Sequence, residues 1–431
     1  MTLRFTFRRG IHPEGRKHIS SGIPLTDFPT PAQVYISLSQ HIGAPAEPTV
    51  AVGDKVMAGT LIGKANGFVS ANIFSSVSGT VKALMMRPTA LGTKANHIEI
   101  ENDGQYTKEL LKPLEIINKE SVIARVKEAG IVGMGGATFP THVKLMPKNP
   151  VDTLLINAAE CEPYITCDYR LCLEKAKEVV RGTELLMIAL GVERAYIGIE
   201  DNKPDAIAAL KDASTDNIGI IPLVTKYPQG AEKQLIYSIL RRKVPVGGLP
   251  ADIGVVVDNA HTAYAVYDAV DNNTPLYRRA MTVSGLAATP GNFWINTGVT
   301  YKEVFEKQEG LSDTAKVISG GPMMGFAQAN LLPSVTKGTS SLLFLKESEF
   351  NEEPITPCIN CARCANACPM RLMPMFIDQA ALQDDIEELE KLNIMSCIEC
   401  GSCSYSCPAN RPLVMSIKRA KNLLRKQGGK K

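Results

Sequence analysis

Eight of the eleven cysteines fall between residues 358 and 407, in two runs with the same spacing. Each run reads CxxCxxCxxxCP. Two residues between successive cysteines let a tight loop present three thiolates to one face of an iron–sulfur cubane, while the fourth cysteine leaves along the following segment and ligates the neighbouring cluster. The spacing therefore predicts two [4Fe–4S] clusters with crossed ligands, one held by Cys358, Cys361, Cys364 and Cys407, the other by Cys397, Cys400, Cys403 and Cys368.

Structural zinc is the alternative for such cysteines, since zinc also takes four thiolates. Zinc requires neither an evenly spaced third cysteine nor a trailing Cys-Pro, so the pattern favours the clusters, which relay single electrons and perform no substrate chemistry. The remaining Cys161, Cys167 and Cys172 lack this spacing, and we expect them to pack as small apolar residues. The six histidines form no pair with metal-ligand spacing.

The length of 431 residues predicts about three or more domains. A net charge of +3 gives no support to nucleic-acid binding, so we expect no nucleic-acid partner. The first residues, MTLRFTFRRGIHPEG, contain no continuous apolar segment, which predicts that the chain is not exported. No apolar run is long enough to span a bilayer, so any membrane contact is expected to be peripheral.

Short Val-, Ile- and Phe-rich segments separated by glycine turns run through residues 50–100, which predicts a small β sandwich or barrel. The elements at residues 53–63 and 75–81 resemble the biotinyl/lipoyl-like barrel-sandwich family. That family attaches its cofactor to a hairpin lysine, whereas the matching hairpin NGFVSANIF has none. We therefore expect a structural N-terminal barrel-sandwich-like β domain over residues 1–109.

Strands alternate with helices from residue 110 onward, which predicts a parallel sheet covered by helices over residues 110–272. Short β segments and one helix predict a β-grasp-like domain at 273–348.

The last domain, 349–431, begins with the polar linker EFNEEPITP and is expected to be mostly helical, with residues 370–394 helical except at Pro374. From Arg411 onward the chain carries eight basic residues and no acidic residue. We interpret this segment as a solvated helix and tail; the alternative is a surface that binds an acidic partner or anionic lipid. The fold class is thus multidomain α/β.

A glycine-rich segment, GIVGMGGATFPTHVK, predicts a loop that can approach a ligand closely and direct backbone amides at an anion. Its ligand-facing residues are expected to be Gly133, Gly135 and Gly136, with Lys144 meeting a phosphate. The next segment, LLINAAECEPYITCDYR, ends a predicted strand near Asn157, at the edge where parallel sheets bind nucleotides.

These two segments together resemble the flavin-binding region of the NADH-oxidising subunit of respiratory complex I. The resemblance implies that the glycines, Lys144 and Asn157 hold non-covalent FMN, and that Glu160 and Glu162 line the nicotinamide pocket. Farther on, YPQGAEKQL and VVVDNAHT resemble other segments of that family, which implies Glu232 near the nucleotide and Asn259 near the flavin. One departure is Ala159, where the family has aspartate. Surface acids and a helix cap remain the structural alternatives for Glu160, Glu162, Glu232 and Asn259.

The order of these modules resembles the C subunit of the Rnf electron-transport complex over about nine-tenths of the chain. The resemblance implies an NAD-linked ferredoxin oxidoreductase subunit of an ion-translocating membrane complex, which exchanges hydride between NAD(H) and FMN and passes electrons through the two clusters. It also implies partners, namely integral membrane subunits and a ferredoxin-like iron–sulfur subunit, and a peripheral location on the cytoplasmic face of the cell membrane. A soluble cobalamin-reductase-like flavoprotein and a non-enzymatic relay subunit are the alternatives.

Overall fold

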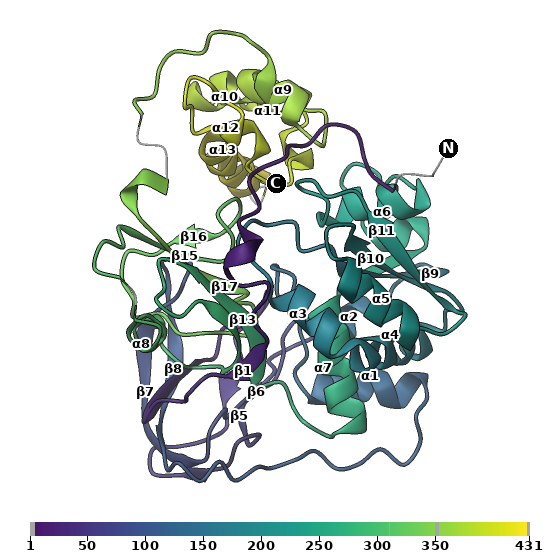
Figure 1. The fold of residues 1–431 in the computed structure, drawn as a ribbon, viewed down its shortest axis with the longest axis vertical. Helices are drawn as coiled ribbons and strands as arrows, with labels where there is room; N and C mark the ends of the chain where they lie inside the picture. The colour runs from purple at the N-terminus through teal and green to yellow at the C-terminus, as the bar shows by residue number, and fades with distance from the viewer. Residues whose placement is uncertain (1–4, 310, 350–352, 429–431) are drawn as a thin grey trace.

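The structure, a computed structural model, describes residues 5–309, 311–349 and 353–428. In Figure 1 the α/β part lies on the right, the β-rich parts lie on the left, and the yellow helical module with the cysteine runs lies above both. Residues 350–352 of the predicted linker and residues 429–431 of the basic tail lie outside the described residues.

The N-terminal β domain consists of two antiparallel sheets, with strand orders β2-β8-β7-β4 and β3-β5-β6. Val34 and Ile36 in β2, and Ile98 and Ile100 in β8, are apolar, fully buried and two residues apart, as a strand with one face on a core requires. This confirms the barrel-sandwich expectation. The strands are β2 (Gln33–Ser37), β3 (Glu47–Pro48), β4 (Lys55–Val56), β5 (Leu61–Lys64), β6 (Ile73–Phe74), β7 (Gly79–Pro88) and β8 (Lys94–Asn102).

The α/β part has a fully parallel sheet of order β11-β10-β9-β12. The chain passes from β9 outward to β11 and then returns to place β12 on the other side of β9. The strand order therefore reverses between β9 and β12, and ligands of open parallel sheets bind at the carboxyl ends of such strands. The strands are β9 (Thr153–Ala158), β10 (Ala195–Glu200), β11 (Ile218–Leu223) and β12 (Val255–Asn259).

Helices cover both faces of this sheet. One face packs against α1, α4, α5 and α7, and the other packs against α6. The amphipathic pattern of α4 and α7 buries their apolar sides against each other and the strands. The helices are α1 (Lys119–Glu128), α2 (Thr141–Lys144), α3 (Cys167–Glu174), α4 (Ala176–Leu190), α5 (Pro204–Ala213), α6 (Glu232–Leu240) and α7 (Ala260–Asp271), and a 3₁₀ turn, η2 (Pro250–Ile253), precedes β12.

A third, mixed sheet of order β1-β14-β13-β17-β15-β16 with one helix forms the predicted β-grasp-like module. Its hairpin β13–β14 is antiparallel and its last long strand, β17, runs parallel to β13. The sheet shares one apolar core with the barrel sandwich, so the two β modules pack as one body. The elements are β1 (Leu25–Asp27), β13 (Arg278–Gly285), β14 (Gly291–Asn296), α8 (Tyr301–Lys307), β15 (Lys316–Ser319), β16 (Phe326–Ala327) and β17 (Ser341–Leu345), followed by η3 (Glu347–Glu349).

Residues 5–27, which we call the N-terminal strap, tie the parts together. The strap pairs with the end of β11 through Phe5, and Ile11 pairs with Tyr227. It then donates from the Gly10 amide to the Ala367 carbonyl in the cysteine module, at 3.1 Å. After the 3₁₀ turn η1 (Lys17–Ile19) it enters the third sheet as β1, parallel to β14. Figure 1 shows this path in purple.

The C-terminal module is helical around the two cysteine runs. Pro374 begins α10, where its fixed φ and missing N–H suit a first helical position. The prediction that residues 370–394 are helical except at Pro374 is therefore wrong in part. Residues 370–373 are not helical, and Arg371 has φ +59°. The helix also ends before Asp384, whose φ is +54°, and Asp385 caps α11. The elements are α9 (Arg363–Ala367), α10 (Pro374–Leu382), α11 (Ile386–Lys391), η4 (Ile394–Ser396), α12 (Ser402–Tyr405) and α13 (Leu413–Gly428).

Several side chains of the basic α13 are engaged within the chain. Arg419 pairs with Asp384 and Lys421 pairs with Glu399, each at 2.7 Å. Lys418 lies over the ring of Phe326. Among the described residues, no helix combines the length and the apolar character needed to cross a membrane.

Candidate functional site

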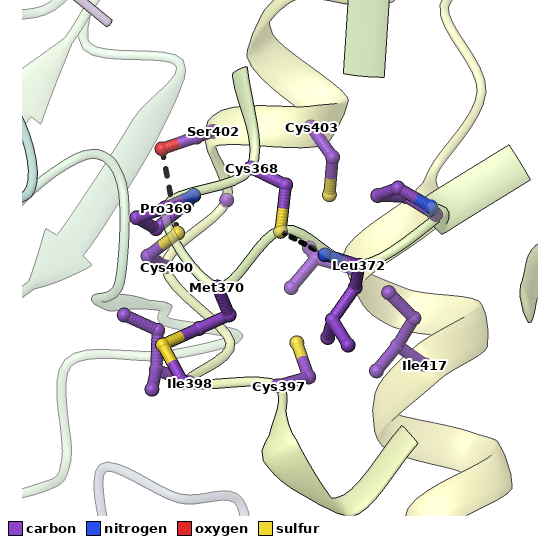
Figure 2. A pocket seen from close by; sticks show the side chains of 13 residues that line it. Cys368, Pro369, Met370, Leu372, Cys397, Ile398, Cys400, Ser402, Cys403 and Ile417 are labelled. Atoms are coloured by element: carbon purple, nitrogen blue, oxygen red, sulfur yellow. Dashed lines mark hydrogen bonds between the residues drawn. The ribbon is translucent and has the colours of Figure 1, made fainter. Parts of the chain in front are cut away.

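The first three cysteines of the second run and the last cysteine of the first run line one cavity. Figure 2 shows the thiols of Cys368, Cys397, Cys400 and Cys403 around this cavity, with Met370 and Leu372 among the apolar side chains beside them. We call it the inner cysteine site, because three of its four cysteines are buried and Cys397 is only partly exposed.

The other four cysteines line a second cavity. Here Cys407, from the second run, joins Cys358, Cys361 and Cys364. We call it the outer cysteine site, because Cys358 and Cys361 are exposed. The structure therefore brings the eight cysteines together in the two crossed groups that the spacing predicts.

The backbone explains why each run turns its thiols inward. Asn360 and Ala362 in the first run, and Glu399 and Gly401 in the second, all have φ between +53° and +77°. These left-handed positions curl the chain around each group of three cysteines before a short helix begins. The fourth cysteine of the first run, Cys368, lies directly after α9 and is carried across to the inner site.

The donor set fits [4Fe–4S] clusters, because each cavity gathers four sulfur ligands within an apolar wall. Burial raises the pKa of Cys397 to about 11 and that of Cys403 to about 12. Thiolates are therefore costly at the inner site without bound cations. Iron supplies the positive charge that compensates them.

The glycine loop lies at the reversal point of the parallel sheet. The Gly133 amide donates to the Phe139 carbonyl at 2.8 Å and closes the loop. A Cβ on Gly135 would lie 3.3 Å from the Cβ of Asn259, so the loop approaches the end of β12 closely. Gly136 has φ +132° and open space beside it, a conformation that side chains rarely adopt. This open glycine backbone fits a bound flavin phosphate or ring.

Asn157 and Asn259 lie side by side at the carboxyl ends of β9 and β12, where they are register partners. Asn157 holds the next loop by donating to the Gly230 carbonyl at 2.7 Å. Asn259 accepts from the His261 amide as the cap of α7 and donates to Asp168 at 2.6 Å. Both asparagines therefore make structural hydrogen bonds at the edge of the sheet where the sequence predicted flavin contacts.

Lys144 does not stand free beside the glycine loop. Its Nζ donates to the Val257 carbonyl at 2.8 Å and lies 3.4 Å from Oδ1 of the fully buried Asp258. Burial raises the pKa of Asp258, and Lys144 opposes that increase. Burial raises the pKa of Glu232, and the charge of Lys144 lowers it. The three residues therefore interact electrostatically.

Glu160 and Glu162 face different neighbours although one residue separates them. The Glu160 carboxylate accepts from the amides of Asp168 and Tyr169 at the start of α3, at 2.7 and 3.3 Å. Glu162 instead accepts from the Met323 amide, in the loop after β15, at 3.1 Å. Burial raises the pKa of each carboxyl to about 7.

Two lysines at this edge, the buried Lys203 and the partly buried Lys17, were missed by sequence reasoning. Lys17, from the strap, donates to the carbonyls of Glu160, Glu162 and Ile165 at 2.6 to 3.0 Å. Lys203 donates to the carbonyl of Ala159, the position where the complex I family has aspartate. Each lysine comes from a segment distant in sequence from the loop that it holds, so no local sequence pattern indicated either residue.

The three cysteines outside the runs lie in the α/β part. Cys167 and Cys172 are buried in apolar cores, where burial raises their pKa, and Cys161 accepts from the Gly230 amide through its sulfur. Ligand atoms of Glu160, Cys167 and Asp168 lie within 4.8 Å of one another. Positive charge from Lys17, Lys203 and Arg279 acts on these groups, and we assign them no ion.

Three segments of the chain match known families. Residues 5–105 match the RnfC barrel sandwich hybrid domain, residues 126–268 match the Nuo51 FMN-binding domain, and residues 352–408 match the 4Fe-4S dicluster domain. These ranges fall inside the first, second and fourth predicted domains, whose bounds remain predictions.

Full-length relatives decide the family. The chain is 45% identical to the C subunit of the proton-translocating ferredoxin:NAD(+) oxidoreductase complex of Clostridium ljungdahlii, over 98% of this chain and 95% of that protein. The chain belongs to the RnfC family. It is also 45% identical to the C subunit of the Na(+)-translocating ferredoxin:NAD(+) oxidoreductase complex of Acetobacterium woodii, over 96% of each chain.

A solved structure supports the fold of this RnfC-family chain. An NAD+-reducing [NiFe]-hydrogenase in the H2-reduced state aligns with 73% of this chain and 63% of that chain, with a TM-score of 0.52 and 20% identity. Together with the family matches, this confirms the multidomain α/β fold class. The matches to the FMN-binding and 4Fe-4S dicluster domains confirm the two cofactor types, FMN and [4Fe–4S]. The individual residues assigned to them stay predictions.

Proposed function

We propose that this chain exchanges hydride between NAD(H) and FMN and relays single electrons through two [4Fe–4S] clusters, as one component of an ion-translocating ferredoxin:NAD+ oxidoreductase complex. The observation that carries the proposal is the contact between the flavin-binding part and the inner cysteine site. There Ile11, Tyr227, Ala367 and Cys400 form one buried apolar cluster, joined by Cys161, Met323 and Ile398. Electrons therefore have a packed, water-poor path from one part to the other.

FMN, when bound, supplies the chemistry that exchanges an electron pair with the nicotinamide and single electrons with the clusters. We propose that the protein holds it with Gly133, Gly135, Gly136, Lys144, Asn157 and Asn259, and that Glu160 and Glu232 lie on the nucleotide side. The glycines leave room and present amides, the asparagines fix the two strand ends, and Lys144 adds positive charge. The nicotinamide role predicted for Glu162 stays a prediction.

The eight run cysteines are the proposed cluster ligands, in the inner and outer groups defined above. The proposed partners are integral membrane subunits and a ferredoxin-like iron–sulfur subunit, with the chain peripheral on the cytoplasmic face of the membrane. The names of the relatives support an assembly of several different chains, since each relative is named as one component of an oxidoreductase complex. Copurification with membrane subunits would favour this assembly, and isolation as a soluble enzyme would favour the cobalamin-reductase-like alternative.

Cofactor content tests the proposal directly. Protein prepared without oxygen should contain about eight iron and about eight acid-labile sulfide per chain, because two cubanes require them. Reconstituted with FMN, it should oxidise NADH with an artificial acceptor. Stoichiometric zinc without sulfide would contradict the cluster assignment. Full clusters and bound FMN without NADH oxidation would instead favour a relay subunit, the role that Ala159 in place of aspartate leaves open.

Lys144→Ala is expected to weaken FMN retention and to lower the free energy of unfolding by about 2 kcal/mol, because Asp258 loses its counter-charge while buried. FMN content after gel filtration and denaturant unfolding measure the two effects. The double variant Lys144→Ala/Asp258→Asn removes the buried charge and should regain stability. If the double variant also regains FMN, Lys144 acts only by stabilising the strand end and does not meet the phosphate.

A further inference from the structure

Glu162 and Tyr227 lie where the α/β part, the loop after β15 and the inner cysteine site meet. The Tyr227 hydroxyl donates to the Cys400 carbonyl at 2.7 Å, and the Tyr227 side chain is 1% exposed. Burial raises the pKa of Tyr227, and the Glu162 carboxylate lies close enough to the same hydroxyl to raise it further. Glu162 and Tyr227 are therefore polar side chains beside an otherwise apolar junction that includes Cys400.

One atom of the Glu162 carboxylate lacks a partner. Oε2 of Glu162 accepts from the Met323 amide, whereas Oε1 is buried and has no hydrogen-bond partner among the described residues. The loop packs directly against the carboxylate, since a Cβ on Gly321 would lie 2.2 Å from Oε2. A proton on Oε1 would turn this unpartnered acceptor into a hydrogen-bond donor.

The groups around Glu162 have opposing effects on the pKa of its carboxyl group. Lys17 faces it from the strap, Glu160 and Cys161 flank it on its own loop, Tyr227 faces it from the segment before α6, and the amides of Met323 and Met324 face it from the third sheet. Burial raises its pKa to about 7, against the lowering effects of the amides and Lys17. An additional negative charge nearby raises this pKa further and shifts the carboxyl group toward its protonated form.

We propose that Glu162 is a redox-linked proton site: it takes up one proton from solvent when the cluster of the inner cysteine site gains one electron, and it releases that proton on reoxidation. This inference rests on the proposed function. The electron comes from reduced flavin, an O–H bond forms on Glu162, and no other bond changes. The physical cause is the strong interaction between charges in a poorly solvated region. Protonation removes the negative charge beside a cluster that has just become more negative.

The expected signature is a reduction potential of the inner cluster that rises as pH falls. Redox titrations of the full chain with both clusters, followed by EPR between about pH 6 and about pH 8, measure it around the pKa. In Glu162→Gln the charge is gone at every pH, so the inner-cluster potential should be higher at alkaline pH and nearly independent of pH. The control is Glu193→Gln, an exposed acid before β10 at the opposite edge of the sheet, which should titrate like the parent.

A pH-independent potential in the parent would overturn the proposal, and so would a Glu162→Gln variant that keeps the parent's pH dependence. If that variant fails to assemble clusters, redox-difference infrared spectra of the parent decide instead. Reduction should then produce a carboxylic-acid C=O band that moves in Glu162→Asp, and a missing band would refute the proposal. Intact clusters whose potentials do not depend on pH would contradict the proton site but not the proposed electron relay. A parent protein without clusters would contradict both the proton site and the relay.

Discussion

Replacing Cys368 with alanine is expected to abolish the EPR signal of the cluster built on Cys397, Cys400 and Cys403 and to remove up to about half of the iron. The reason is the position of Cys368 after α9, which places its thiol at the inner cavity rather than with its own run. Cys368 itself is buried, as are Cys400 and Cys403 beside it, so no solvent thiol or water readily replaces it. Iron analysis and EPR of the reduced protein measure the loss.

The control for this prediction is Cys172→Ala, which removes a buried cysteine in the core of the α/β part, outside both cavities. It should keep about eight iron per chain. Loss confined to the signal of the outer cluster in Cys368→Ala would refute crossed ligation, since the outer cavity is lined by the other three cysteines of that run together with Cys407.

The cysteine groups could be predicted because their geometry is local. Fixed spacings of two and three residues determine where each thiol points, and the left-handed residues that curl each loop lie between the ligands themselves. The position of the glycine loop at the sheet edge could be predicted in the same way from the neighbouring sequence, since the loop precedes the strand that ends near Asn157. Local sequence patterns of this kind determine the nearby backbone and side-chain positions by themselves.

The charged neighbours could not be predicted, because they depend on contacts between distant segments. Nothing near Lys144 in sequence indicates that the end of β12 brings Asp258 within 3.4 Å of it. Likewise Lys17 reaches the loop after β9 only because the strap passes between the modules. Glu160 and Glu162 read alike in sequence, yet a left-handed turn at Glu160, with φ +49°, sends one carboxylate to α3 and the other to Met323.

Gly135→Leu is expected to weaken FMN binding at least tenfold, which corresponds to about 1.4 kcal/mol, and to abolish NADH oxidation at limiting FMN. A Cβ at this position already lies 3.3 Å from Asn259, so a leucine side chain must occupy the space between the glycine loop and the strand ends. That space is where the flavin is proposed to lie. Titration of the apoprotein with FMN, followed by flavin fluorescence, gives the affinity.

The matched control is Gly191→Ala, which changes a glycine at the end of α4 with open space beside it. Its φ of +70° makes alanine cost some stability there, so the control also reports the effect of mild destabilisation on FMN binding. Iron and sulfide should remain at parental levels in both variants, because the cluster ligands come from a separate helical module. Parental FMN affinity in Gly135→Leu would place the flavin elsewhere along the sheet edge, whereas loss of FMN and clusters together would indicate misfolding. Only selective loss of FMN supports the glycine loop as the flavin site.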